Sequence, residues 1–126
     1  MSYFNVEKEI NKLKKSLNES VDFSYRYFKK DGQIIGFVYL KSIIDSQLFS
    51  SAIYYPIQTY KGKITFDNLK NDLIKCVDIK DAKKEDMIKE ILDGRVILLS
   101  NFSNEILSID LLKFPTRSPS EPPTSP

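Results

Sequence analysis

The residues Val96, Ile97, Leu98 and Leu99 form an uninterrupted apolar run that begins two residues after Gly94. Successive side chains of a β-strand point to opposite faces of a sheet, so a strand built from this run is apolar on both faces. Such a strand must be covered on both faces, or on one face plus a neighbouring element, which favours a central place in a sheet. A glycine at Gly94 is typical of a helix end, because it adopts the left-handed conformation that closes the last turn. The run therefore predicts a helix leading into a central strand over 95–100.

Two hairpins are predicted around this strand. Residues 22–28 alternate, with Phe23, Tyr25 and Tyr27 on one side, and Asp31-Gly32 supplies a tight turn before an apolar return strand over 34–40. After the central strand, a turn over 101–104 leads into a partner strand over 105–110.

Helices are predicted where apolar residues recur three or four positions apart. Four such stripes are Val6, Ile10, Leu13 and Leu17; Leu48, Phe49, Ala52 and Ile53; Phe66, Leu69, Leu73 and Cys76; and Met87, Ile88, Ile91 and Leu92. Asp45 is a suitable N-cap for the second helix, Pro56 should stop it, and the third should begin near Thr65. Val77 and Ile79 suggest a short strand before the fourth helix. The expected fold is mixed α+β (α/β), a small mixed β-sheet with packed helices in the order αββααβαββ.

The length of 126 residues suits one domain with a substantial core. Five of the six prolines lie between Pro115 and Pro126, in a segment otherwise rich in serine and threonine. Proline removes amide donors and favours extended backbone, so neither helix nor sheet is expected there. We predict a single domain over 1–113 and a Pro/Ser-rich linker or disordered tail over 114–126.

Composition removes several functional classes. There is no histidine, so the usual general base near neutral pH and the commonest transition-metal ligand are both missing. The single cysteine, Cys76, lies on an apolar helical stripe and is interpreted as a buried structural thiol. A net charge of +2 does not indicate nucleic-acid binding, and no apolar run approaches the length of a membrane span. We expect no catalytic, cofactor or metal site.

Two residue groups allow a functional reading beside a structural one. Four acidic residues could offer oxygen ligands to calcium, but they lack the spacing of an EF-hand and are interpreted as a solvated helix entrance: Asp78, Asp81, Glu85 and Asp86. Six tyrosines could line a small-molecule pocket, although packing against the core is the simpler reading: Tyr25, Tyr27, Tyr39, Tyr54, Tyr55 and Tyr60.

The order of these elements resembles the first soluble subdomain of the spore germination receptor A-subunit family, the GerA family. The resemblance is carried by the helix, glycine and strand over 91–100, by the segments 36–45 and 53–57, and by the motif Arg117-Ser118-Pro119-Ser120-Glu121-Pro122. The chain departs from the family pattern at Ser100-Asn101 and at Lys41-Ser42, where the family has an acidic residue followed by glycine. Both turns are therefore expected to be built differently.

The resemblance implies a non-enzymatic part of the soluble sensory or assembly module of a nutrient receptor, present here as a truncated or partial subunit. Its implied partners are other germination receptor subunits, with no nucleic acid and no membrane insertion by this chain. Family members sit in the spore inner membrane, and this fragment would lie on the soluble, cytoplasmic or spore-core side. Arg117, Glu121 and Pro122 would form an interdomain motif. The alternatives are a stand-alone α/β binding or protein-interaction domain of unknown ligand, and a small enzyme using carboxylates and lysines.

Overall fold

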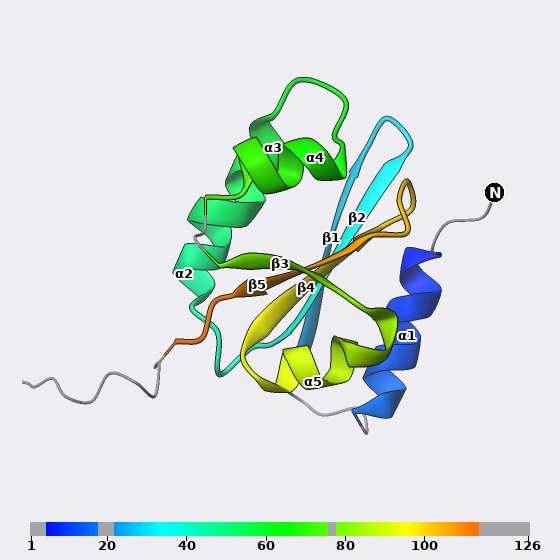
Figure 1. Cartoon of the computed structure of the whole chain (residues 1–126), viewed down its shortest axis with the longest axis vertical. Helices are drawn as coiled ribbons and strands as arrows, with labels where there is room; N and C mark the ends of the chain where they lie inside the picture. Colours follow the sequence, from blue (N-terminus) through cyan, green and yellow to red (C-terminus); the bar gives the residue numbers. More distant parts are fainter. Residues whose placement is uncertain (1–4, 18–21, 76–77, 114–126) are drawn as a thin grey trace, which may run out of the picture.

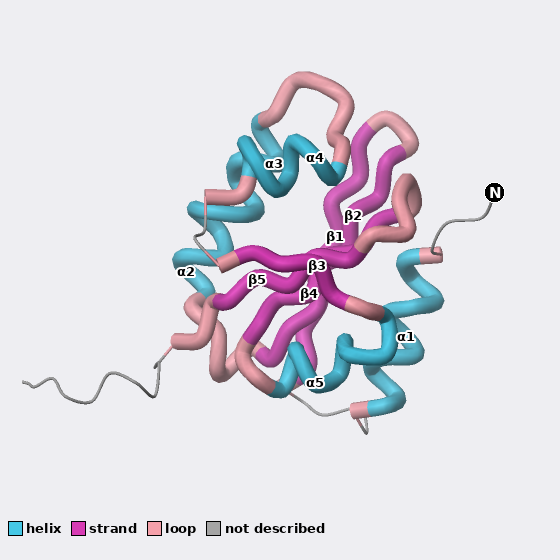
Figure 2. The backbone as a smooth tube through the Cα atoms, in the orientation of Figure 1, coloured by secondary structure: helices cyan, strands magenta, loops and turns pink. Residues whose placement is uncertain are grey.

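The computed structural model describes residues 5–17, 22–75 and 78–113, which form one five-stranded sheet with helices on both faces (Figures 1 and 2). The spatial strand order is β1-β2-β4-β5-β3, and all four pairings are antiparallel. The strands are β1 Phe23–Lys30, β2 Gln33–Leu40, β3 Ile79–Ala82, β4 Arg95–Ser100 and β5 Ile106–Asp110. The predicted fold class and element order are confirmed, whereas the expected mixture of strand directions is replaced by a fully antiparallel sheet.

The helical segments are short and several change their winding. The first is α1 Val6–Ser16. Helix α2 Ser46–Leu48 continues through a π-helix, Phe49–Tyr54, into α3 Tyr55–Thr59, and α4 Phe66–Asn68 continues into a second π-helix, Leu69–Leu73. A 3₁₀ turn over Lys84–Asp86 leads into α5 Met87–Leu92. The α2–α3 unit and the α4 unit lie on one face of the sheet, and α1 with α5 lie on the other (Figure 1).

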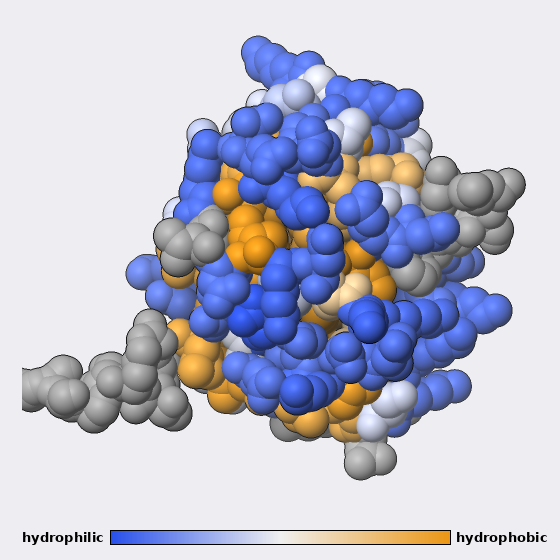
Figure 3. All heavy atoms as spheres, in the orientation of Figure 1, coloured by the Kyte–Doolittle hydropathy of each residue, from blue (hydrophilic) through white to orange (hydrophobic). Residues whose placement is uncertain are grey.

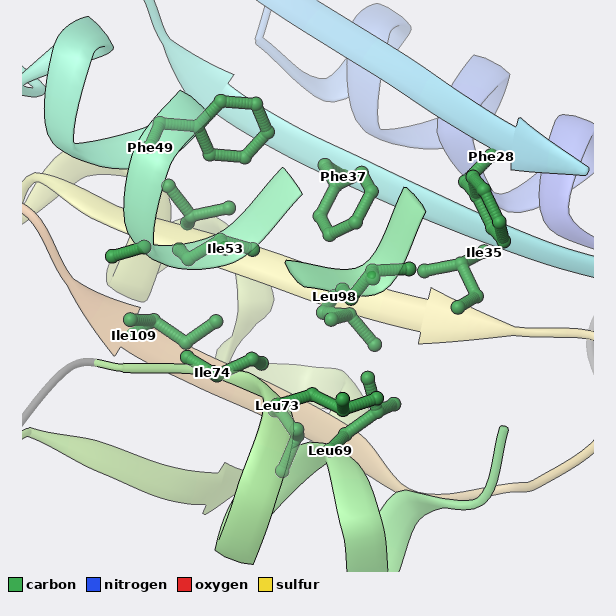
Figure 4. Close-up of a cluster of buried hydrophobic side chains, with 14 of the residues drawn as sticks. Phe28, Ile35, Phe37, Phe49, Ile53, Leu69, Leu73, Ile74, Leu98 and Ile109 are labelled. Atoms are coloured by element: carbon green, nitrogen blue, oxygen red, sulfur yellow. The ribbon is translucent and has the colours of Figure 1, made fainter. Parts of the chain in front are cut away.

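Strand β4 lies in the middle of the sheet, as its apolar run predicts. Val96, Ile97, Leu98 and Leu99 are all 0% exposed. Val96 and Leu98 belong to the core under α2–α4, and Ile97 and Leu99 to the core under α1 and α5. Figure 4 shows Leu98 within the first of these cores, between the sheet and the helices. The strand is therefore buried by two separate apolar layers.

The predicted turns and caps are also confirmed. Asp31 and Gly32 both have positive φ, of 50° and 83°, as a two-residue hairpin turn between right-twisted strands requires. Gly94 closes α5 with φ of 87°. The Asp45 carboxylate accepts the Leu48 amide hydrogen at 3.1 Å, which makes it the N-cap of α2.

The sequence prediction was wrong about Pro56, because the helical chain continues through it to Thr59. Proline lacks the amide hydrogen that would bond to the carbonyl four residues earlier, which belongs to Ala52. In the structure the Lys75 amide donates to that carbonyl at 2.9 Å. In the wider π-helical turn just before Pro56, the Tyr55 amide donates a hydrogen bond to the Ser50 carbonyl, five residues earlier. A contact from a distant segment thus satisfies the group that proline leaves open.

Two leucines expected in the core face solvent. Leu48 is 41% exposed and Leu92 is 55% exposed. Leu48 lies before the π-helix, and the buried residues of that helical stretch are the other three of the predicted stripe, Phe49, Ala52 and Ile53. In α5 the buried pair is Met87 and Ile91, one turn apart, which leaves Leu92 on the outer side.

Other expectations fall partly outside the described residues. The third predicted helix does begin after Thr65, which caps it together with Asn68, but its helical turns end at Leu73. The short strand is present as β3 from Ile79 onward. The predicted burial of Cys76, the place of Val77 and the linker or tail over 114–126 lie outside the described residues.

Helix α1 packs directly onto the backbone of β2 at Gly36. A Cβ atom added to Gly36 would lie 2.5 Å from Val6 Cγ1 and 3.0 Å from Ile10 Cδ1, closer than carbon atoms normally approach. We predict that Gly36→Ala lowers the free energy of unfolding by about 2 kcal/mol, because overpacking forces α1 away from the sheet. Urea denaturation measures this change.

The matched control is Val6→Ala, which removes the colliding methyl groups. In the double variant the loss should be smaller than the sum of the two single losses by about 1 kcal/mol. Strict additivity would show that α1 does not approach β2 at this point.

Candidate functional site

The described chain leaves the domain beside the start of α2. Residues Leu111–Lys113 run antiparallel to Ile43–Asp45: the Asp45 amide donates to the Leu111 carbonyl at 2.8 Å, and the Lys113 amide donates to the Ile43 carbonyl at 2.8 Å. The Leu111 and Ile44 side chains are each 2% exposed. The exit point is therefore fixed to the core on one side and to the α2 N-terminus on the other.

Asp22 fastens the neighbouring turn. Its carboxylate accepts the Ser42 amide hydrogen at 3.0 Å and the Ser42 hydroxyl hydrogen at 2.7 Å, while its carbonyl accepts the Lys41 amide hydrogen at 2.9 Å. Lys41-Ser42 is one of the two turns expected from the sequence to be built differently. A side-chain clamp from the start of β1 holds this turn.

A hollow of about 530 Å³ lies between this turn and the chain exit. Its lining residues are Asp22, Lys41, Ser42, Ile44, Asp45, Ser46, Gln47 and Lys113. Figure 3 shows apolar surface beside the point where the described chain ends. The hollow thus joins polar groups from three segments to the last described residue.

A second hollow, of about 480 Å³, follows the outer side of the α2–α3 unit. It is lined by Ser46, Gln47, Ser50, Ser51 and Tyr55, and it shares Ser46 and Gln47 with the first hollow. The Tyr55 residue at its far end is 62% exposed. The two neighbouring hollows, which share Ser46 and Gln47 and reach from Lys113 to Tyr55, are together called the exit groove below.

A separate polar cluster lies at the β3 end of the sheet, on the face covered by α5. The Ser108 hydroxyl donates to Glu90 Oε1 at 2.8 Å and accepts from Arg95 Nε at 2.6 Å. Lys80 Nζ lies 3.2 Å from Glu90 Oε2, and Arg95 Nη2 donates to Asp78 Oδ1 at 2.9 Å. These five residues link α5 to β3, β4 and β5.

The cluster holds its carboxylates ionised. Burial alone raises the pKa of Glu90, but hydrogen bonds from Ser108 and Lys80 and the charge of Arg95 outweigh it and lower that pKa below the ordinary value. The hydrogen bond from Arg95 likewise lowers the pKa of Asp78. A proton donor near neutral pH needs a raised carboxyl pKa, so this arrangement favours anchoring of α5 over acid catalysis.

The acidic group considered for calcium is divided by the fold. Asp78 pairs with Arg95, and Asp81 pairs with Lys70 at 3.1 Å. Within 5–17, 22–75 and 78–113, no three His, Cys, Asp or Glu side chains come together as a metal site. Arg117, Glu121 and Pro122, the predicted interdomain residues, lie outside the described residues.

The tyrosines do not converge on one pocket. Tyr39, Tyr54 and Tyr60 pack against the core, and Tyr25 is 48% exposed on β1. The Tyr54 hydroxyl donates to the Tyr27 carbonyl at 3.2 Å, so its polar end serves the backbone of an edge strand. Burial raises the pKa of Tyr39, and the charge of Arg26 opposes this only in part.

Sequence reasoning did not identify the exit groove or the Glu90 cluster. The serines at 46, 50 and 51 and Tyr55 line one hollow in the structure, but at about 3.6 residues per turn their spacing does not place them on one side of a helix. The cluster joins residues up to 30 positions apart, from Asp78 to Ser108, and no local spacing indicates it.

Known proteins match this chain both in sequence and in fold. A family model described as "Bacillus/Clostridium GerA spore germination protein" matches residues 11–126. The fold is similar to the crystal structure of the N-terminal domain of the A subunit of the Bacillus megaterium spore germinant receptor GerK3, with a TM-score of 0.62 and 20% sequence identity. That alignment covers 87% of this chain and 48% of the other, so the chain spans about half the length of its structural relative.

No curated protein sequence matches the chain. In the part of the chain that the structure describes, no helix is both long enough and apolar enough to cross a bilayer.

The Glu90 cluster predicts a defined pH dependence. Because the pKa of Glu90 is lowered on folding, its contribution to stability is present above its unfolded-state pKa and is lost as pH falls through the folded-state pKa. Glu90→Gln should lower the free energy of unfolding by about 2 kcal/mol at pH 7. The difference from the unsubstituted chain should shrink between about pH 5 and pH 3.

Chemical denaturation at several pH values measures this difference, with the exposed Glu85→Gln as the matched control. The control should change stability by no more than about 0.5 kcal/mol. If the Glu90 and Glu85 variants behave alike, the charge of Glu90 does not anchor α5.

Proposed function

The chain belongs to the Bacillus/Clostridium GerA spore germination protein family, and from that premise we propose that it is the first soluble subdomain of a germinant receptor A subunit. The observation that carries the proposal is the family match over 11–126, which includes almost the whole chain. The fold similarity to the N-terminal domain of an A subunit supports it. Since the alignment covers 48% of that domain, we infer that the chain supplies one of its halves.

The proposed role is sensory or assembly work without catalysis. The only buried acidic side chains described are those of Glu9 and Glu90, and each is engaged by lysine or arginine. The described hollows lie on the surface and lack a convergent set of acid, base and nucleophile. A domain of this kind acts through the surfaces that it presents to other chains.

The proposed partners are the other subunits of a receptor at the spore inner membrane, with this subdomain on its soluble side. Arg117, Glu121 and Pro122 would connect it to the next subdomain, starting from the exit beside α2. Nutrient binding would then change how this subdomain sits against its neighbours, which requires that the two arrangements differ in affinity for the nutrient. The fixed exit at Leu111–Lys113 suits such a role, because it transmits a displacement of the linker to the core.

Deletion of the coding region in the source bacterium tests the proposal. Spores without the chain should respond more slowly to at least one nutrient mixture, measured as the loss of optical density, and should respond normally to a nutrient-independent trigger. Reintroducing the chain should restore the rate, whereas a chain carrying Leu98→Asp, which places a charge in the core, should not. Equal loss of response to both triggers would contradict a receptor role.

A further inference from the structure

The exit groove has the chemistry of a site for an extended, proline-containing peptide. Such peptides leave their backbone carbonyls free of internal hydrogen bonds and dock on aromatic side chains. The groove offers the exposed ring of Tyr55 at one end and polar side chains from Ser46 and Gln47 to Ser51 along its length. Among the described residues, the side chains of Gln47, Ser50 and Ser51 make no hydrogen bond, so their donors are available to a peptide.

The chain itself carries a peptide of this type at the entrance to the groove. Lys113 is bonded to Ile43 and lines the same hollow as Ser46 and Gln47. The next residues are Phe114-Pro115-Thr116-Arg117-Ser118-Pro119. No other segment of the chain has this composition, since five of the six prolines follow Lys113.

The lengths agree. Ser46 and Tyr55 are nine residues apart on a helical stretch, which is at most about 14 Å at the α-helical rise of 1.5 Å per residue, since the π-helix Phe49–Tyr54 rises less. Six residues of extended polyproline geometry span about 19 Å. Because side chains lean toward the N-terminus of a helix, the Tyr55 ring is directed back toward Ser51 and shortens the path.

We propose that residues 114–119 bind in the exit groove of their own domain, with Pro119 against the Tyr55 ring. The first half of the proline-containing segment, Arg117 included, is then part of this domain's surface, so that of the proposed interdomain motif only Glu121 and Pro122 connect to the next subdomain. This assignment concerns only the present chain. It holds or fails independently of the receptor function proposed above.

Paramagnetic broadening in the full chain tests the proposal. A nitroxide is attached at Ser120→Cys in a Cys76→Ser background, so that the label has a single site. Amide signals of Ser50, Ser51 and Tyr55 should lose more than half of their intensity relative to the reduced label. The amide of Lys8, an exposed residue of α1 on the other face of the sheet, should keep its intensity.

Proximity to the exit alone could cause some broadening, so a second substitution distinguishes docking from it. Tyr55→Ser, at a residue already 62% exposed, should preserve folding and at least double the remaining intensity at Ser50 and Ser51. Leu92→Ser is the matched exposed-apolar control and should change nothing. Absence of broadening, or broadening that Tyr55→Ser does not relieve, would overturn the proposal.

Mixing isotope-labelled chain without nitroxide with unlabelled chain carrying nitroxide separates docking within one molecule from docking between two. Unaltered signals in the mixture support binding within the same chain. Broadening of Ser51 in the mixture would show that the groove receives the segment of a second copy, which contradicts the assignment.

Discussion

The need to bury both faces of β4 governs this domain. Four consecutive side chains with no exposure require apolar cover above and below the sheet, and the rest of the chain supplies it. Helical segments between β2 and β3 cover one face, while the first helix and α5 cover the other. Gly36 contributes to this cover, because only a residue without a side chain lets α1 approach β2 so closely. Two of the antiparallel pairings, β1–β2 and β4–β5, are hairpins with short connections, whereas β2–β4 and β3–β5 join strands that are far apart in the chain.

Polar groups that this packing would otherwise leave unpaired are satisfied from distant parts of the chain. The buried Gln33 amide donates to the Ile64 carbonyl at 2.7 Å and accepts the Ile64 amide hydrogen at 3.0 Å, which ties a long loop to β2. Lys75 satisfies the carbonyl freed by Pro56. The Ser108 hydroxyl accepts a hydrogen bond from Arg95 and donates one to Glu90. Each of these links joins elements that are separate in sequence, so each depends on the complete fold.

The same architecture fixes where the last described residues lie on the domain. The residues after β5 pair with the start of α2, so the last described residue, Lys113, lies beside a helix whose outer side carries serines and an exposed tyrosine. The Glu90 cluster fastens α5 close to that exit, because Arg95 pairs with Asp110 across the sheet and the Asp78 carbonyl accepts the Asp110 amide hydrogen.

Local sequence determined the strands around β4, the turn at Asp31-Gly32, the helix end at Gly94 and the cap at Asp45, because each depends on contacts within a few residues. The family resemblance was likewise readable from the order of the elements, and the match over 11–126 confirms it. The sequence did not indicate the exposure of Leu48 and Leu92, the passage of a helix through Pro56, the exit groove or the Glu90 cluster. Those features depend on π-helical winding, on a donor from Lys75 and on charges brought together by strand pairing, and only the tertiary structure supplies these.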